Sequence, residues 1–164
     1  MIKSFFYNKK WRLWSRGGLS VLIISLWIQV SLTVAINTWY GGFYDLLQNA
    51  GDYKDNPLDG ISIFYAKLIS VQYTLNGFEG DISFAEIVFP YIFVAIFTGW
   101  FTRIYGLKWR EAMTFSYIPR WQSVEEEIEG ASQRIQDDCY KFAKIVESLG
   151  LQVIRAIMTL IAFI

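Results

Sequence analysis

Acidic side chains are concentrated between residues 125 and 147 of this chain, where their chemistry would be the binding and release of protons. They are Glu125, Glu126, Glu127, Glu129, Asp137, Asp138 and Glu147. The sequence contains no histidine, the commonest side chain for carrying protons near neutral pH. Any pH-coupled work therefore falls to carboxylates.

Most of these carboxylates have an ordinary structural explanation. Opposite charges lie four residues apart, and so together on one helix surface, in the pairs Arg134–Asp138 and Asp137–Lys141. The cluster at residues 125–127 follows Pro119 near a predicted helix start, where acidic side chains complement the helix dipole. For this cluster we favour the structural interpretation.

Glu147 differs from the others because it precedes an uncharged segment. Its apolar neighbours are Ile145, Val146, Leu149 and Leu151. A low dielectric favours the neutral form of a carboxylate, which allows such a group to exchange a proton near physiological pH. Arg155, eight residues further on, is a candidate ionic partner. The residues alone leave a proton-binding role and a purely structural one equally open.

A second polar set lies in the first uncharged segment. Gln29, Thr33 and Asn37 are spaced by four residues and therefore share one face of a helix. They are candidates for lining a polar path through the membrane. Hydrogen bonds between helices, without any transport, explain them about as well.

Several chemistries have no support in the sequence. The single cysteine, Cys139, together with the lack of histidine argues against a disulfide framework and most zinc sites. No Walker pattern, GxSxG elbow or HExxH motif occurs. The 15 basic and 15 acidic residues cancel, so net charge gives no sign of a nucleic-acid partner. We expect no enzyme, no metal and no cofactor.

The composition instead indicates a membrane protein. Apolar residues form 54% of the chain and charged residues only 18%, against about 25% in soluble domains. Residues 17–44 carry no charge and would make a helix of roughly 42 Å, which is enough to cross a bilayer. Residues 87–102 are also uncharged, and apolar residues before them and snorkelling of Arg103 and Lys108 extend this span.

A third uncharged run, residues 156–164, is too short to cross the hydrocarbon core, which takes about 20 helical residues. We therefore predict spans at about 17–44 and 82–105 and an incomplete span from 151. On this interpretation the sequence is the front part of a longer membrane protein.

The distribution of charge predicts the orientation of the chain. Before the first span there are five basic residues and no acidic residue, and the charged residues within 45–86 are mainly acidic. Basic residues return from Arg103 onwards. The positive-inside rule then places the N-terminus in the cytoplasm and an outer loop, 45–81, on the opposite side. Aromatic and basic residues alternate in Met1–Arg16, an arrangement suited to an anionic inner leaflet.

Two further helices are expected outside the bilayer. Residues 61–73 are apolar and aromatic, and we predict a short outer helix there. Residues 106–150 should form a cytoplasmic elbow of two helices separated near Pro119, because proline removes a backbone donor. The returning helix carries one apolar stripe at helical spacing: Val124, Ile128, Ala131, Ile135, Cys139, Phe142, Val146 and Leu149.

Three blocks of sequence closely resemble the SbmA/BacA family of bacterial inner-membrane peptide transporters. They are VAINTWYGGFYDLLQNA (34–50), LKWREAM (107–113) and IEGASQRIQDDCYKFAKIVESLG running into AIMTLIAF (128–163). The resemblance leaves out residues 52–81, which look like an extra outer segment. The first membrane-spanning region of the family is shortened or absent here.

The resemblance implies a fold and a function. Members are similar to the transmembrane half of ABC exporters without the nucleotide-binding domain, form homodimers, and import peptides and peptide-like antibiotics with the proton gradient. Carried over by position, Glu147 matches a glutamate implicated in proton coupling, and Asp137 and Asp138 are further candidates. The remaining residues on the shared motif are Glu129, Gln133 and Arg134.

We therefore predict an all-α, polytopic, ABC-exporter-like transmembrane domain in the bacterial inner membrane. Its expected partners are the lipid bilayer, a peptide substrate and, in the full-length protein, a second copy of the chain. Two alternatives stay open. One is the membrane domain of an ATP-driven exporter of lipids or very-long-chain fatty acyl compounds, and the other is a non-transporting membrane fragment or scaffold.

Overall fold

The structure is a computed structural model that describes residues 2–69, 82–123 and 130–164. The side chains of residues 131 and 132 are not described. The chain divides into two compact units, one of residues 1–27 and 97–161 and one of residues 28–96 and 162–164. Each unit is described by itself below.

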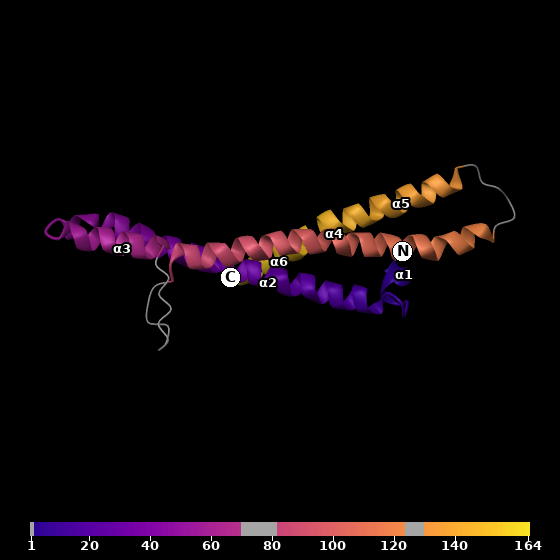
Figure 1. Cartoon of the computed structure of the whole chain (residues 1–164), viewed down its shortest axis with the longest axis horizontal. Coiled ribbons are helices and arrows are strands. Elements are labelled where there is room, and N and C mark those ends of the chain that lie inside the picture. Colours follow the sequence, from indigo (N-terminus) through magenta and orange to yellow (C-terminus); the bar gives the residue numbers. More distant parts are fainter. Residues whose placement is uncertain (1, 70–81, 124–129) are drawn as a thin grey trace. The chain divides into compact units, whose positions relative to one another are not determined.

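The described residues form helices and contain no strand, which confirms the all-α prediction. Figure 1 labels the α-helices α1 to α6 along the chain, and short π or 3-10 turns join some of them. The full order is α1 (Ile2–Phe6), a π-helical turn (Leu13–Gly17), α2 (Gly18–Gln48), a 3-10 turn (Ala50–Tyr53), α3 (Pro57–Ile69), α4 (Phe84–Gln122), α5 (Ala131–Ile145), a second π-helical turn (Val146–Gly150) and α6 (Leu151–Ala162).

Three helical segments in the described part of the chain are long and apolar enough to cross a membrane: Leu13–Gln48, Phe84–Gln122 and Gln133–Ala162. The first contains the predicted span 17–44, the second overlaps the predicted span 82–105 from residue 84 onwards, and both extend further on the C-terminal side. The third is longer than expected from the sequence, because the helix already begins well before residue 151. A multi-pass helical membrane protein is therefore confirmed.

A capping box starts α4. The Ser83 backbone N–H donates to the Glu86 carboxylate at 2.9 Å, and the Glu86 N–H donates back to the Ser83 hydroxyl at 3.4 Å. These two bonds satisfy donors that have no partner in the first turn of a helix. The S-x-x-E pattern thus fixes the beginning of the longest helix.

The predicted break at Pro119 is wrong. Helix α4 continues through Pro119 and ends three residues later, at Gln122. A proline so close to the end of a helix removes one backbone donor without interrupting a long run of bonds after it. The first helix of the elbow therefore extends past Pro119 to Gln122.

Helices α4 and α5 form the antiparallel hairpin that the elbow predicted (Figure 1). Their contacts move backwards along one helix as they move forwards along the other. The neighbouring pairs across the hairpin are Gly106 and Glu147, Trp109 and Phe142, Arg110 and Tyr140, and Thr114 and Cys139.

The apolar stripe of α5 faces this hairpin. Cys139 is only 1% exposed, and Ile135, Phe142 and Val146 pack against the same core. The prediction for Leu149 is wrong, since that side chain is 56% exposed. The π-helical turn at 146–150 holds an extra residue compared with an α-helical turn, so the stripe leaves its face there. Val124 and Ile128 lie outside the described residues, and Ala131 lies among those whose side chains are not described.

Aromatic side chains form the core of the first unit. Phe5 is fully buried and stacks on Trp109 with ring centroids 5.2 Å apart. Tyr105 meets the edge of Phe5 at 5.4 Å and donates its hydroxyl to the Ser15 carbonyl at 3.0 Å. Phe5 and Trp11 of the N-terminal segment are thus used for packing, whereas Tyr7 and the basic residues of the segment are exposed.

The second unit is held together by Trp39. Its indole N–H donates to the Lys67 carbonyl of α3 at 3.0 Å, and its ring stacks on Phe43 at 4.7 Å. The predicted outer helix is present as α3, but it begins at Pro57, four residues earlier than expected. Proline suits the first position of a helix because its missing N–H would have no helical partner there.

Candidate functional site

Glu147 lies in the π-helical turn between α5 and α6 and is partly buried. Its side chain rests on Gly106 of α4. A Cβ atom at position 106 would lie 2.9 Å from the Glu147 Oε2 atom and 3.6 Å from its Cδ atom. The carboxylate can occupy this position only because residue 106 has no side chain.

The carboxylate also borders a small cavity of about 190 Å³. Most of its lining is apolar, and it comes from the N-terminal segment, α2, α4 and the chain from Ala143 to Ile154. The described lining residues are Phe6, Leu19, Leu22, Thr102, Tyr105, Gly106, Trp109, Ala143, Val146, Glu147, Gly150, Leu151 and Ile154. Glu147 therefore lies at the edge of a mainly apolar cavity.

The π-helical turn is what the sequence analysis missed here. The turn places both Glu147 and Gly150 on the cavity, while Leu149 faces away. Turns of this kind are rare and occur often at functional sites, where they redirect a side chain. A glycine within an apolar helical segment, such as Gly106, was the signal that could have indicated a close approach of two helices.

The other proton-coupling candidates do not join Glu147. Asp137 and Asp138 are exposed on α5, as are Gln133 and Arg134. Neither of the predicted pairs with Arg134 or Lys141 forms an ion pair, within the part of the chain that the structure describes. Glu129 and the cluster at 125–127 lie outside the described residues.

The three polar residues predicted to share a face of α2 differ in their contacts. Gln29 is 3% exposed, and its amide donates to the Val94 carbonyl of α4 at 3.5 Å. The Thr33 hydroxyl donates to the Gln29 carbonyl in its own helix at 2.9 Å, and both Thr33 and Asn37 are exposed. The contact of Gln29 is therefore a hydrogen bond between helices, which was the structural alternative to a transport path.

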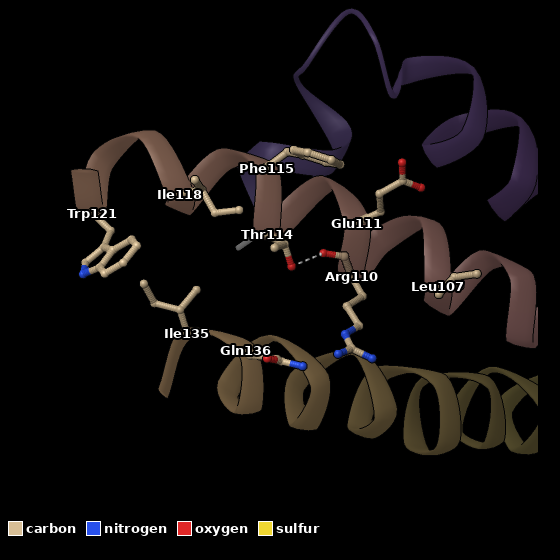
Figure 2. A pocket seen from close by; sticks show the side chains of 9 residues that line it. All are labelled: Leu107, Arg110, Glu111, Thr114, Phe115, Ile118, Trp121, Ile135 and Gln136. Atoms are coloured by element: carbon tan, nitrogen blue, oxygen red, sulfur yellow. Dashed lines mark hydrogen bonds between the residues drawn. The ribbon is translucent and has the colours of Figure 1, made fainter. Parts of the chain in front are cut away.

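A larger cavity of about 540 Å³ lies further along the hairpin, between α4 and α5. Figure 2 shows Arg110 reaching from α4 towards α5, where Gln136 lies nearby. The Arg110 guanidinium is held over the Tyr140 ring at 5.1 Å, and the Thr114 hydroxyl donates to the Arg110 carbonyl at 3.0 Å. The rest of the lining is mainly apolar, and the Arg110 cation is already engaged with Tyr140. The sequence analysis did not find it.

No group of three or more potential ligands is placed to hold a metal ion, among the residues that the structure describes. The arrangement is that of a multi-pass helical membrane protein with one carboxylate carried into an apolar cavity.

The chain matches the SbmA/BacA-like family over residues 8–164, and it belongs to that family. The match covers nearly the whole chain and confirms the resemblance seen in the sequence. Members of this family are transporters, so the protein belongs with membrane transporters rather than with enzymes. No solved structure matches the chain.

Proposed function

We propose that this protein belongs to a proton-driven transporter that imports peptides or peptide-like antibiotics across the bacterial inner membrane. The observation that carries the proposal is the position of Glu147, whose carboxylate lies on Gly106 at the edge of an apolar cavity. A carboxylate in such a place can take up a proton on one side of the membrane and release it on the other.

The proposed architecture is that of an ABC-exporter-like transmembrane domain, which works as a homodimer. The N-terminus and the hairpin of residues 106–150 would lie in the cytoplasm, and residues 45–81 outside. The family membership and the three long apolar helices support this arrangement. In this proposal peptide would bind between the two protomers.

Other residues have subordinate roles in this proposal. Asp137 and Asp138 are exposed on α5 and could exchange protons with the cytoplasm. Gln133, Arg134 and Glu129 would belong to the family motif near the cytoplasmic turn. Thr33 and Asn37, exposed on α2, would line the transport path, while Gln29 holds α2 to α4.

Uptake of a fluorescent antimicrobial peptide by bacterial cells tests the proposal. The complete gene is expressed in a strain that lacks its own peptide importer, and the Glu147→Gln variant should abolish uptake at an unchanged membrane level. Glu111→Gln is the matched control, since Glu111 lies on the neighbouring helix in an ion pair with Lys108 at 2.9 Å. This control should import at the rate of the unmodified protein.

Each outcome decides one part of the proposal. Uptake by Glu147→Gln at the unmodified rate removes Glu147 from the mechanism. Uptake that persists in the presence of a protonophore removes proton coupling, and dependence on ATP would favour the exporter alternative. Absence of uptake by the unmodified protein at a normal membrane level would favour a scaffold.

A further inference from the structure

The indole N–H of Trp109 has no hydrogen-bond partner although it is buried. Trp109 is 7% exposed, and its Nε1 atom is the one buried side-chain nitrogen or oxygen without a partner in the described part of the chain. Leaving a buried donor unsatisfied is destabilising, so such groups call for an explanation. Trp109 lines the same cavity as Glu147.

The other polar groups of this cavity are already engaged as donors. The Thr102 hydroxyl donates to the Thr98 carbonyl at 2.7 Å, and the Tyr105 hydroxyl donates to the Ser15 carbonyl at 3.0 Å. Trp109 is therefore the donor left over among the described lining residues, and Glu147 supplies the carboxylate there. An indole can donate but cannot accept, so it can bind only a group that carries lone pairs.

The hairpin directs the two side chains towards each other. Side chains on a helix lean towards its N-terminus. Helices α4 and α5 are antiparallel, with Glu147 beside Gly106 and Trp109 one turn further along α4. Trp109 therefore leans towards the level of Gly106, where the carboxylate lies. Glu147 in turn leans towards the level of Trp109.

Two basic residues near this cavity along the chain have contacts of their own. Lys108 pairs with Glu111 at 2.9 Å, and Lys144 lies over the Tyr140 ring at 5.7 Å. Among the described lining residues, Tyr105 is the other titratable group, and the segments from the N-terminus, α2 and α6 contribute apolar side chains. Glu147 thus faces one free donor and no lining cation.

We propose that the Trp109 indole N–H holds the charged carboxylate of Glu147, directly or through one water molecule in the cavity, and releases it when the carboxylate takes up a proton. On protonation the new carboxyl O–H donates to a hydroxyl oxygen of Thr102 or Tyr105, and the indole loses its acceptor. Trp109 is then a positioning residue that stabilises the charged form. This inference rests on the proton-binding role of Glu147 in the proposed function.

The indole N–H resonance of Trp109 gives the first test. The full protein, labelled with 15N at tryptophan and held in lipid nanodiscs, is titrated from about pH 4 to about pH 9, a range that includes ordinary carboxyl titration and neutral pH. Trp109→Phe assigns the resonance among the seven tryptophans. The proton resonance should move downfield as the pH rises. Glu147→Gln should abolish this movement, and Glu111→Gln should leave it unchanged.

The infrared band of the protonated carboxyl gives the second test, because it reports on Glu147 without Trp109. The band is identified by its loss in Glu147→Gln. Trp109→Phe keeps an aromatic ring between Phe5 and Phe142 but removes the donor. The midpoint of the band should then rise by about one pH unit, a tenfold gain in proton affinity, because the charged form has lost its hydrogen bond.

A Trp109 resonance that does not move with pH, or that moves equally in Glu147→Gln, would overturn the inference. So would an unchanged infrared midpoint in Trp109→Phe. These results are independent of peptide uptake. If the resonance follows Glu147 but Glu147→Gln still imports peptide, the proposed function fails and the Trp109 bond stands.

Discussion

The Glu147 carboxylate occupies the space that a side chain at residue 106 would fill, and Gly106 leaves this space empty. The Oε2 atom of Glu147 lies 2.9 Å from the place of a Cβ atom at residue 106. Such a contact is closer than two atoms can sit without one of them moving. Because Oε2 is the far end of a flexible side chain, the carboxylate can move away while the helices keep their positions.

Gly106→Ala should therefore separate function from stability. The added methyl group displaces the carboxylate from α4, and we expect at least a tenfold loss of proton-driven uptake. Alanine favours a helix by up to about 1 kcal/mol over glycine, so the unfolding temperature in detergent should stay the same or rise. Uptake and thermal unfolding, measured on the same preparation, check both effects.

Gly99→Ala is the matched control on the same helix, because a Cβ atom there meets nothing within 4 Å. This variant should gain the helix stabilisation and keep full uptake. Equal uptake by the two variants would show that the contact between residue 106 and the carboxylate has no functional role.

The sequence was sufficient to single out Glu147 but not its partners. A charge next to an uncharged segment is a local pattern, whereas the fold alone brings Gly106 and Trp109 to the cavity that Glu147 lines. The exposed position of Asp137 and Asp138 likewise depends on which face of α5 packs on α4. Residue spacing predicts the apolar stripe of α5, but it does not predict that Leu149 leaves this stripe at the π-helical turn.

At the scale of elements, the sequence predicted which segments are helical better than where they end. The positions of α2 and α4 follow from runs of uncharged residues, and α3 follows from a short apolar segment. Their ends depend on single residues: the Ser83–Glu86 capping box begins α4, and Pro119 does not end it. Proline is tolerated near a helix end, and the sequence does not say how many residues follow it in the helix.

Pro119→Ala should stabilise α4, because alanine restores a backbone donor for the Phe115 carbonyl. We expect a gain of about 1 kcal/mol or more relative to Pro57→Ala, in which the proline occupies the first position of α3. Both substitutions loosen the unfolded chain equally, so their difference isolates the effect on the helix. Thermal unfolding in one detergent measures it. Equal effects of the two would contradict a helix that continues through Pro119.

The register of the hairpin can be tested with the native cysteine. The Thr114 side chain of α4 lies next to the Cys139 side chain of α5. In Thr114→Cys the two sulfur atoms should oxidise readily to a disulfide, and both thiols should disappear from a mass-spectrometric thiol assay. Ser123→Cys places the new thiol near the end of α4, bonded to the Arg120 carbonyl, and should stay reduced under the same conditions. Free thiols in oxidised Thr114→Cys would contradict this register.

At the scale of the whole molecule, the proposed orientation rests on the charged residues that precede and follow α2. The basic residues of the N-terminal segment are all exposed: Lys3, Lys9, Lys10, Arg12 and Arg16. Acidic side chains lie exposed after α2, at Asp52, Asp55 and Asp59. Lys10 also lies over the Trp11 ring at 5.3 Å, and exposed basic residues of this kind suit an anionic lipid surface.

The orientation predicts which cysteine variants a membrane-impermeant maleimide can reach in intact cells with a permeabilised outer membrane. In a Cys139→Ala background, Asp55→Cys should react at once, because residue 55 is exposed and proposed to lie outside. Lys9→Cys and Ser123→Cys, equally exposed, should react only after lysis, because both are proposed to be cytoplasmic. Cell lysis reveals all three, so it controls for intrinsic reactivity. The reverse pattern would place Glu147 on a hairpin outside the cell, where it could not deliver protons to the cytoplasm.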